Sequence, residues 1–114
     1  MEITLVPSEV NGSVKAPSSK SMMQRAIAAA LLSDSECTIL NPSYCNDSLA
    51  AIGIAENLGA EVEKKITELK ISSSHKIKNR TLDCKESGLA IRMFSPSAAL
   101  NAGVIIMTGS GSLK

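Results

Sequence analysis

Residues 17–25, Pro-Ser-Ser-Lys-Ser-Met-Met-Gln-Arg, combine a helix start with side chains that bind anions. One of the two serines before Lys20 is placed to cap an alanine-rich helix. Lys20 and Ser21 then fall in the first turn, where free backbone N–H groups and the helix dipole favour negative charge. Arg25 shares a helix face with Ser21, four residues earlier. Because a lysine in a first turn is unfavourable without an anion, we predict a phosphate or carboxylate site; the alternative is a capped helix with solvated basic residues.

A second stretch, Ser-Gly-Leu-Ala-Ile-Arg at 87–92, has a similar design. Ser87 can cap a helix, and Gly88 leaves the backbone amides open to a ligand because it has no side chain. Arg92 follows one turn into the helix. Alone this stretch is a simple helix cap, but opposite the first site it would form the second wall of an anion pocket. Such a pocket suits a ligand with two or more negative groups.

The composition limits which other functions are open to the chain. Its 114 residues allow one domain with a modest core, and 44% of them are hydrophobic. The net charge of +1 and the presence of only Tyr44 and Phe94 as aromatic residues argue against nucleic-acid binding. The longest apolar run, 26–32, is too short to cross a bilayer, and residues 1–6 lack the features of a signal peptide. We therefore expect a cytoplasmic protein without nucleic-acid or membrane partners.

The cysteines and the histidine do not suggest a catalytic or metal site. Cys37, Cys45 and Cys84 are odd in number and lack metal-type spacing, which is typical of buried free thiols in a reducing cytoplasm. His75 stands alone in a polar connector, so no serine–histidine or cysteine–histidine pair is expected. The chain also has neither a Walker-type loop nor a dinucleotide fingerprint.

Strands alternate with helices along the chain, which predicts an α/β or α+β fold with right-handed crossovers. The first helix is expected at 19–32, the second from a cap at Asn46 or Asp47 to a stop at Gly59, and the third at 87–100 with Pro96 kinking or shortening it. The expected strands are 3–6, 12–16, 36–40, a pair containing Val62, Ile66, Leu69 and Ile71, 81–84, and a buried strand at 103–107. On the second helix, Leu49, Ile52, Ala55 and Leu58 form the predicted inner stripe.

The chain resembles itself at a shift of 67 positions. Arg25 then falls on Arg92, Ser21 falls on Gly88, and the strand at 36–40 falls on 103–107. The segment 12–16 likewise falls on 79–83. Identity between the copies is low, so coincidence is the alternative. If the repeat is real, two similar units pack side by side, both helix starts can face one cleft, and two copies may not be the complete set.

These motifs resemble the N-terminal part of the 5-enolpyruvylshikimate-3-phosphate synthase family. The resemblance runs through essentially the whole chain. It is carried by 17–25 with its alanine-rich continuation, by Asn46 and Asp47, by 58–60, by Ser87 and Gly88 with Arg92, and by 108–113. The related UDP-N-acetylglucosamine enolpyruvyl transferases, which usually have lysine–asparagine where this chain has Lys20 and Ser21, are the second match.

The resemblance implies an inside-out α/β fold made of βαβαββ units, three in each of two domains, of which this chain is a partial domain. Residues 1–16 would form strands that pair within the absent second domain. Residues 17–114 would form the first unit and the start of the second unit of the N-terminal-half domain. We therefore expect the remainder of the enzyme chain to be a partner.

The resemblance also implies a reaction and roles for individual residues. The enolpyruvyl group of phosphoenolpyruvate would move to the 5-hydroxyl of shikimate 3-phosphate, a step toward chorismate and the aromatic amino acids, without a metal or organic cofactor. Lys20 would be catalytic and touch both substrates. Ser21 and Arg25 would hold shikimate 3-phosphate, and Gly88 would line the phosphoenolpyruvate pocket, where glyphosate binds in this family. Arg92 would support that wall.

Three positions depart from the family pattern. Ser18 replaces a glycine, and Glu86 and Leu89 stand where many members have asparagine and threonine. Because an acidic residue beside a carboxylate pocket repels the ligand unless it points away, neither phosphoenolpyruvate affinity nor glyphosate sensitivity follows from the resemblance. The family's next binding arginine, and a second domain with a catalytic aspartate and glutamate, lie beyond Lys114. We therefore expect a fragment that is inactive alone; the alternative is a non-catalytic anion-binding module.

Overall fold

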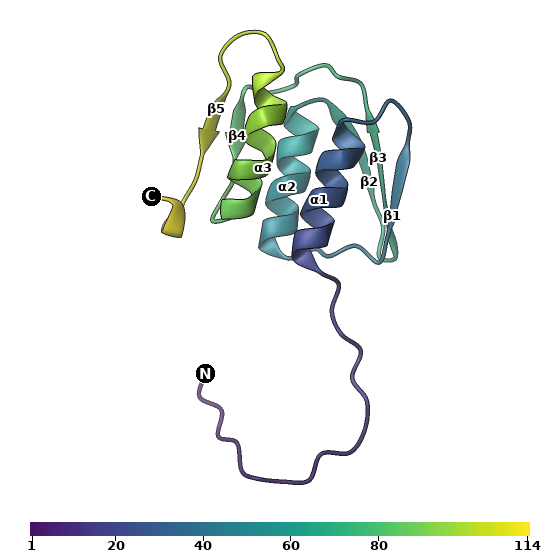
Figure 1. Ribbon diagram of the computed structural model, residues 1–114, viewed down its shortest axis with the longest axis vertical. Helices are drawn as coiled ribbons and strands as arrows, with labels where there is room; N and C mark the ends of the chain where they lie inside the picture. The colour runs from purple at the N-terminus through teal and green to yellow at the C-terminus, as the bar shows by residue number, and fades with distance from the viewer.

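Three helices stand side by side and begin at the same end of the molecule in the computed structural model, which describes residues 1–114 (Figure 1). They are α1 (Lys20–Leu31), α2 (Asn46–Asn57) and α3 (Gly88–Ala99). The strands are β1 (Cys37–Leu40), β2 (Ala60–Lys64), β3 (Glu68–Ser73), β4 (Thr81–Asp83) and β5 (Ile106–Thr108), and a 3-10 turn, η1 (Gly111–Leu113), follows β5. None of the helices has the length and apolar character needed to cross a membrane.

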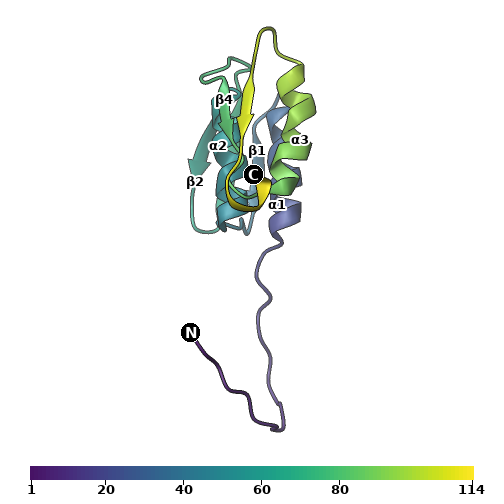
Figure 2. The ribbon, with the colours of Figure 1, turned by 90° about the vertical axis from the view of Figure 1, so that its left-hand side faces the viewer.

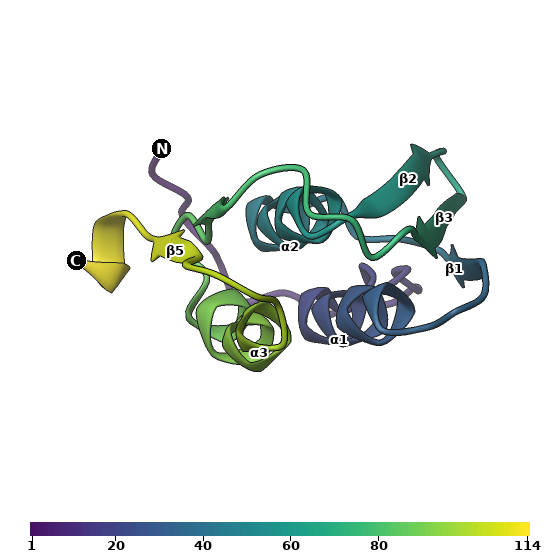
Figure 3. The same cartoon turned by 90° about the horizontal axis from the view of Figure 1, so that it is seen from above.

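Two separate sheets flank the helices. One has the order β1–β3–β2 with antiparallel pairs, so that Ile71 of β3 lies opposite both Cys37 and Val62. In the other, β4 and β5 are parallel and lie side by side, with α3 as their crossover (Figure 2). Seen from above, the helices lie between the two sheets (Figure 3). This arrangement confirms the predicted mixed α/β fold.

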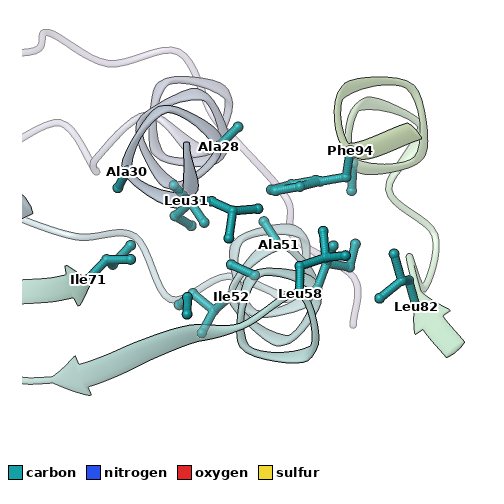
Figure 4. Close-up of a cluster of buried hydrophobic side chains, with 14 of the residues drawn as sticks. Ala28, Ala30, Leu31, Ala51, Ile52, Leu58, Ile71, Leu82 and Phe94 are labelled. Atoms are coloured by element: carbon teal, nitrogen blue, oxygen red, sulfur yellow. The ribbon is translucent and has the colours of Figure 1, made fainter. Parts of the chain in front are cut away.

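The core is built where the three helices meet the sheets. Its side chains come from every helix and from both sheets, and Phe94 of α3 extends toward residues of α1 and α2 (Figure 4). Ala51 and Ala55 are fully buried, and such small side chains let helices pack closely. Burying Phe94 removes a large apolar surface from water, which fixes α3 against its neighbours.

The starts of α1 and α3 are capped as the sequence predicts. The Ser19 hydroxyl accepts a hydrogen bond from the Met22 N–H at 3.3 Å. The start of α2 is different, because its N-cap is Cys45, which makes no side-chain cap hydrogen bond. The prediction of Asn46 or Asp47 as the cap is wrong by one or two residues. Both lie inside the first turn, where the Asp47 carboxylate favourably faces the helix dipole.

The predicted strands at 3–6 and 12–16 are absent. Residues 1–18 form no helix or strand, are exposed throughout, and extend away from the helices (Figure 1). A strand is stable only when another strand satisfies its backbone N–H and C=O groups, and no neighbouring edge lies beside this segment. Alternating apolar residues alone therefore do not make a strand here.

The predicted buried strand at 103–107 is also corrected. The observed strand β5 begins later, at Ile106, and that side chain is 55% exposed. Val104 precedes the strand and is exposed as well. The reason is that β5 pairs only with β4, and its outer side has no covering element. The apolar run 103–107 predicted a buried strand, but burial requires a further element that covers β5.

Three smaller predictions also differ from the structure. Leu49 is exposed, although the other predicted stripe residues of α2 are buried. Ile66 lies in the turn between β2 and β3 and is exposed, because a hairpin turn projects from the sheet. Pro96 does not shorten α3, which continues to Ala99.

The internal repeat is visible in its helix and second strand. The N-caps Ser19 and Ser87 lie 68 positions apart, one more than the shift of 67 positions predicted from the sequence. Residues 38–40 of β1 and residues 106–108 of β5 share the same alternation of exposed and half-buried side chains. The first copy has no strand equivalent to β4, so the two units correspond only in part.

Candidate anion-binding site at the helix N-termini

The three helix starts face the same end of the molecule (Figure 1). Each start has free backbone N–H groups and the positive end of a helix dipole. Neither α1 nor α3 has an acidic residue in its first turn. This end of the molecule therefore attracts anions before any side chain is considered.

Lys20 links the starts of α1 and α2. Its Nζ donates to Asp47 Oδ2 at 2.9 Å, and the two side chains are 62% and 25% exposed. The hydrogen bond to Asp47, together with the charge of that carboxylate, raises the pKa of Lys20 above 10.5. Lys20 is therefore an ammonium at neutral pH. The sequence analysis did not predict this pair. The available signal was that Lys20 and Asp47 carry opposite charges and each lie at a predicted helix start.

Ser21 and Arg25 lie on another side of α1 from Lys20. Five residues of helix rotate Arg25 by about 140° from Lys20, so the two cations do not meet directly. The Arg25 guanidinium is exposed, and its Nη1 lies 3.6 Å from the Met22 sulfur. It forms no ion pair with a carboxylate, and Ser21 is half-buried. Arg25 is thus available to a ligand that reaches that face of α1.

Gly88 begins α3, and the Arg92 side chain folds back over it. The Arg92 Nε donates to the Gly88 carbonyl oxygen at 2.9 Å. A Cβ atom on Gly88 would lie 3.8 Å from Leu113 Cδ2 and 4.0 Å from Arg92 Nη2, which is ordinary contact. The start of α3 is therefore enclosed by a guanidinium on one side and by the C-terminal turn on another.

The loop from β4 to α3 is held by local hydrogen bonds. Asp83 Oδ1 accepts from the Lys85 N–H at 2.8 Å, and its Oδ2 pairs with Lys85 Nζ at 2.7 Å. The bonds from the Lys85 side chain and backbone lower the pKa of Asp83 below 3.8. Across the loop, the Ser110 N–H donates to the Lys85 carbonyl at 2.7 Å. These bonds fix the approach of the chain to Gly88.

Glu86, which departs from the family pattern, lies against the C-terminal turn. A Cβ atom on Gly111, whose φ is +52°, would lie 1.5 Å from Glu86 Oε1. The carboxylate therefore occupies the space that a side chain at 111 would need. It also lines a polar groove of about 550 Å³ between α2 and the C-terminal segment, together with Asn46, Asp47, Leu49, Ala50, Gly53, Asn57, Asp83, Lys85 and Ser110.

A buried hydrogen bond joins α1 to α3. The Ser87 hydroxyl donates to Gln24 Oε1 at 3.3 Å, and each residue is only 1% exposed. Sequence reasoning did not single out Gln24. The available signal was a polar residue on the inward face of α1, beside Met23 and Ile27, where apolar residues are expected.

The three cysteines are free thiols, as predicted, but the prediction that they are buried holds only for Cys84. Cys45 is exposed because it precedes α2 at the open end of the helices, and Cys37 is half-buried because it begins the edge strand β1. Partial burial raises the pKa of Cys45, but hydrogen bonds from Ser48, Ser43 and the backbone at the start of α2 outweigh that effect, so the pKa is lowered. Burial, with a contribution from the Asp83 charge, raises the pKa of Cys84. No group of three or more histidine, cysteine, aspartate or glutamate side chains is arranged to hold a metal ion.

Three helices that begin at one end of the molecule, flanked by two small sheets, define a small α/β domain with basic side chains near the starts of α1 and α3. Comparisons with known proteins give the particular family. A family model described as EPSP synthase (3-phosphoshikimate 1-carboxyvinyltransferase) matches residues 6–114. The chain belongs to this family.

Individual relatives agree with that assignment. The 3-phosphoshikimate 1-carboxyvinyltransferase of Korarchaeum cryptofilum is 37% identical over 98% of this chain, and that of Clostridium beijerinckii is 38% identical over 97%. The EPSP synthase structure from Acinetobacter baumannii matches 90% of the chain with a TM-score of 0.70 at 21% identity, which supports the fold. This chain spans 27% and 28% of the two relatives' lengths and 24% of the solved chain.

Proposed function

We propose that the chain forms one wall of the active site of an enolpyruvyl transferase. The reaction would move the enolpyruvyl group of phosphoenolpyruvate to the 5-hydroxyl of shikimate 3-phosphate and release phosphate. The observation that carries the proposal is the exposed Lys20 ammonium at the common end of three helix starts, in a chain that belongs to the EPSP synthase family.

The proposed roles follow from charge and position. Lys20 would contact both substrates, exchanging its bond to Asp47 for bonds to their anionic groups. Ser21 and Arg25 would hold shikimate 3-phosphate, and the Gly88 backbone, beside the Arg92 guanidinium, would receive phosphoenolpyruvate. Two anionic substrates repel each other, so fixed positive charge is needed to bring them together and to stabilise the departing phosphate.

The raised pKa of Lys20 restricts its part in the chemistry. In the unliganded chain the group is protonated at neutral pH, so it would act as a hydrogen-bond donor or as an acid rather than as a base. The further groups that the reaction needs would come from the remainder of the enzyme chain. We propose that residues 1–16, which lie extended without a strand partner, pair with that remainder.

Calorimetric titration of this chain with shikimate 3-phosphate tests the binding role. We expect weak binding that falls at least tenfold in Lys20→Ala. Lys76→Ala is the matched control, since Lys76 lies in the loop at the opposite end of the molecule and forms no ion pair. A wild-type chain that binds nothing at millimolar ligand would contradict the proposal.

A second titration, with UDP-N-acetylglucosamine, separates the proposal from the related transferase class. We expect no binding of this ligand, and tighter binding of it than of shikimate 3-phosphate would favour that class. Catalysis is tested by measuring phosphate release after the chain is combined with the remaining portion of a family member. Ligand binding without release in that mixture would favour a non-catalytic anion-binding module.

A further inference from the structure

Gln24 is a polar residue in a position suited to an apolar one. Its side chain lies between α1 and α3 and is 1% exposed. Oε1 accepts from the Ser87 hydroxyl at 3.3 Å, but Nε2 has no hydrogen-bond partner. An unpaired buried donor is costly, and an apolar side chain of the same size would avoid that cost. Packing alone therefore does not account for a glutamine at this position.

The bond to Gln24 orients the cap of α3. Ser87 Oγ also accepts from the Ala90 N–H at 3.2 Å, which is the cap hydrogen bond. A hydroxyl has one proton to donate and two lone pairs to accept with. Because Gln24 takes the proton, the Ser87 lone pairs are left for the helix N–H groups. Gln24 thus acts on the start of α3 from within α1.

The bond also joins the two predicted anion-binding helix starts. Gln24 lies one turn after Lys20 and directly precedes Arg25, and Ser87 directly precedes Gly88. Apolar packing, which includes Phe94, also holds α3 against α1, but the Gln24–Ser87 bond is the buried hydrogen bond that links the first turns of α1 to the backbone beside Gly88.

We propose that Gln24 is a positioning residue that couples the two helix starts, so that an anion bound at one start finds the other already placed. This inference rests on the proposed function, since it assumes that both starts contact anionic groups of the ligands. Gln24 itself is not assigned a contact with substrate.

Backbone amide NMR of the whole chain during titration with inorganic phosphate tests the coupling. In the wild type we expect the amide signals of Ser21 and Gly88 to shift together. In Gln24→Met, which keeps the side-chain length and removes the hydrogen bond, the Gly88 response should weaken at least threefold, while that of Ser21 remains. The Ala90 amide should exchange with solvent about tenfold faster, although the melting temperature does not fall.

Two further variants make the result decisive. Ser87→Ala removes the same bond from the other helix, so it should also weaken the Gly88 response, and the double variant should be no worse than Ser87→Ala alone. Ser97→Ala removes a different buried hydroxyl of α3 and should leave both readouts unchanged. If the wild-type chain binds phosphate, and the Gly88 response and the Ala90 exchange rate of Gln24→Met stay within twofold of the wild-type values, the coupling role of Gln24 is overturned while the proposed function stands. If the wild type binds no phosphate, the proposed function loses its support, and the coupling of anion sites fails with it.

Discussion

Gly59, directly after α2, is the position where a single methyl group should do most harm. Its φ is +111°, a backbone conformation that other residues rarely adopt. A Cβ atom there would lie 2.6 Å from the carbonyl oxygen and 2.7 Å from the nitrogen of Lys76. Both are backbone atoms, so the clash cannot be relieved by rotating a side chain. Gly59→Ala must therefore move the loop 74–79.

The expected cost can be worked from that loop. A strained backbone conformation costs about 1–3 kcal/mol. Moving the loop also weakens the bonds from the Ser74 N–H to the Gly59 carbonyl at 3.0 Å and from the Lys78 and Asn79 N–H groups to the Asn57 carbonyl at 2.8 and 3.1 Å. Each such bond contributes about 1 kcal/mol net. We expect Gly59→Ala to lower the free energy of unfolding by about 2–4 kcal/mol, a large part of the roughly 5–15 kcal/mol typical of a domain.

Gly53→Ala is the matched control. Gly53 lies in the interior of α2 with nothing within 4 Å of its would-be Cβ atom. Alanine is favoured over glycine inside a helix, so this variant should gain about 0.5–1 kcal/mol. Urea denaturation followed by circular dichroism measures both. Changes of the same sign, or a loss below about 0.5 kcal/mol in Gly59→Ala, would refute the reasoning from backbone geometry.

Three other predictions concern charge and thiol chemistry. Asp47→Asn removes the partner of Lys20 and should tighten phosphate binding about two- to fivefold by calorimetry at low salt; unchanged or weaker binding would show that the carboxylate does not compete with the ligand. Iodoacetamide at neutral pH should alkylate Cys45 first and Cys84 only on unfolding, as read by mass spectrometry, because the pKa of the first thiol is lowered and that of the second is raised; the reverse order would contradict this. The pKa of Asp83 is lower in the folded state than its ordinary value of 3.8, so the ionised carboxylate stabilises the fold above that pH, and this stabilisation is lost as the pH falls through the folded-state pKa. Asp83→Asn should therefore lose less stability than the wild type between about pH 4 and pH 2 in urea titrations. Parallel stability curves for the two proteins would contradict this prediction.

Local signals in the sequence were sufficient to place most of the helices and strands. Serine before a basic first turn predicted the start of α1, and Gly59 predicted the end of α2, because these signals act within a few residues. The strands at 3–6 and 12–16, and the burial of 103–107, were predicted wrongly for the opposite reason. A strand and its burial depend on a partner edge and on a covering layer, which no local pattern specifies.

The candidate site divides in the same way. The positions of Lys20 and Gly88 at helix starts follow from motifs read directly along the chain. Their surroundings do not, because Asp47 and Gln24 meet their partners across helix contacts. The Gln24–Ser87 bond joins residues 63 positions apart, and only the packing of α1 against α3 brings them together. The roles assigned to Lys20, Ser21, Arg25 and Gly88 stay predictions until ligand binding is measured.

The common direction of α1, α2 and α3 has a practical consequence for handling the protein. Like poles of neighbouring dipoles repel, so folding places three positive poles together at one end, and only Asp47 among the first-turn residues offsets them. Sulfate or phosphate in the buffer would relieve that repulsion, whereas chloride is a poorer match for paired N–H groups. Melting temperatures recorded in phosphate and in an amine buffer should therefore not be compared as though the solvent were inert.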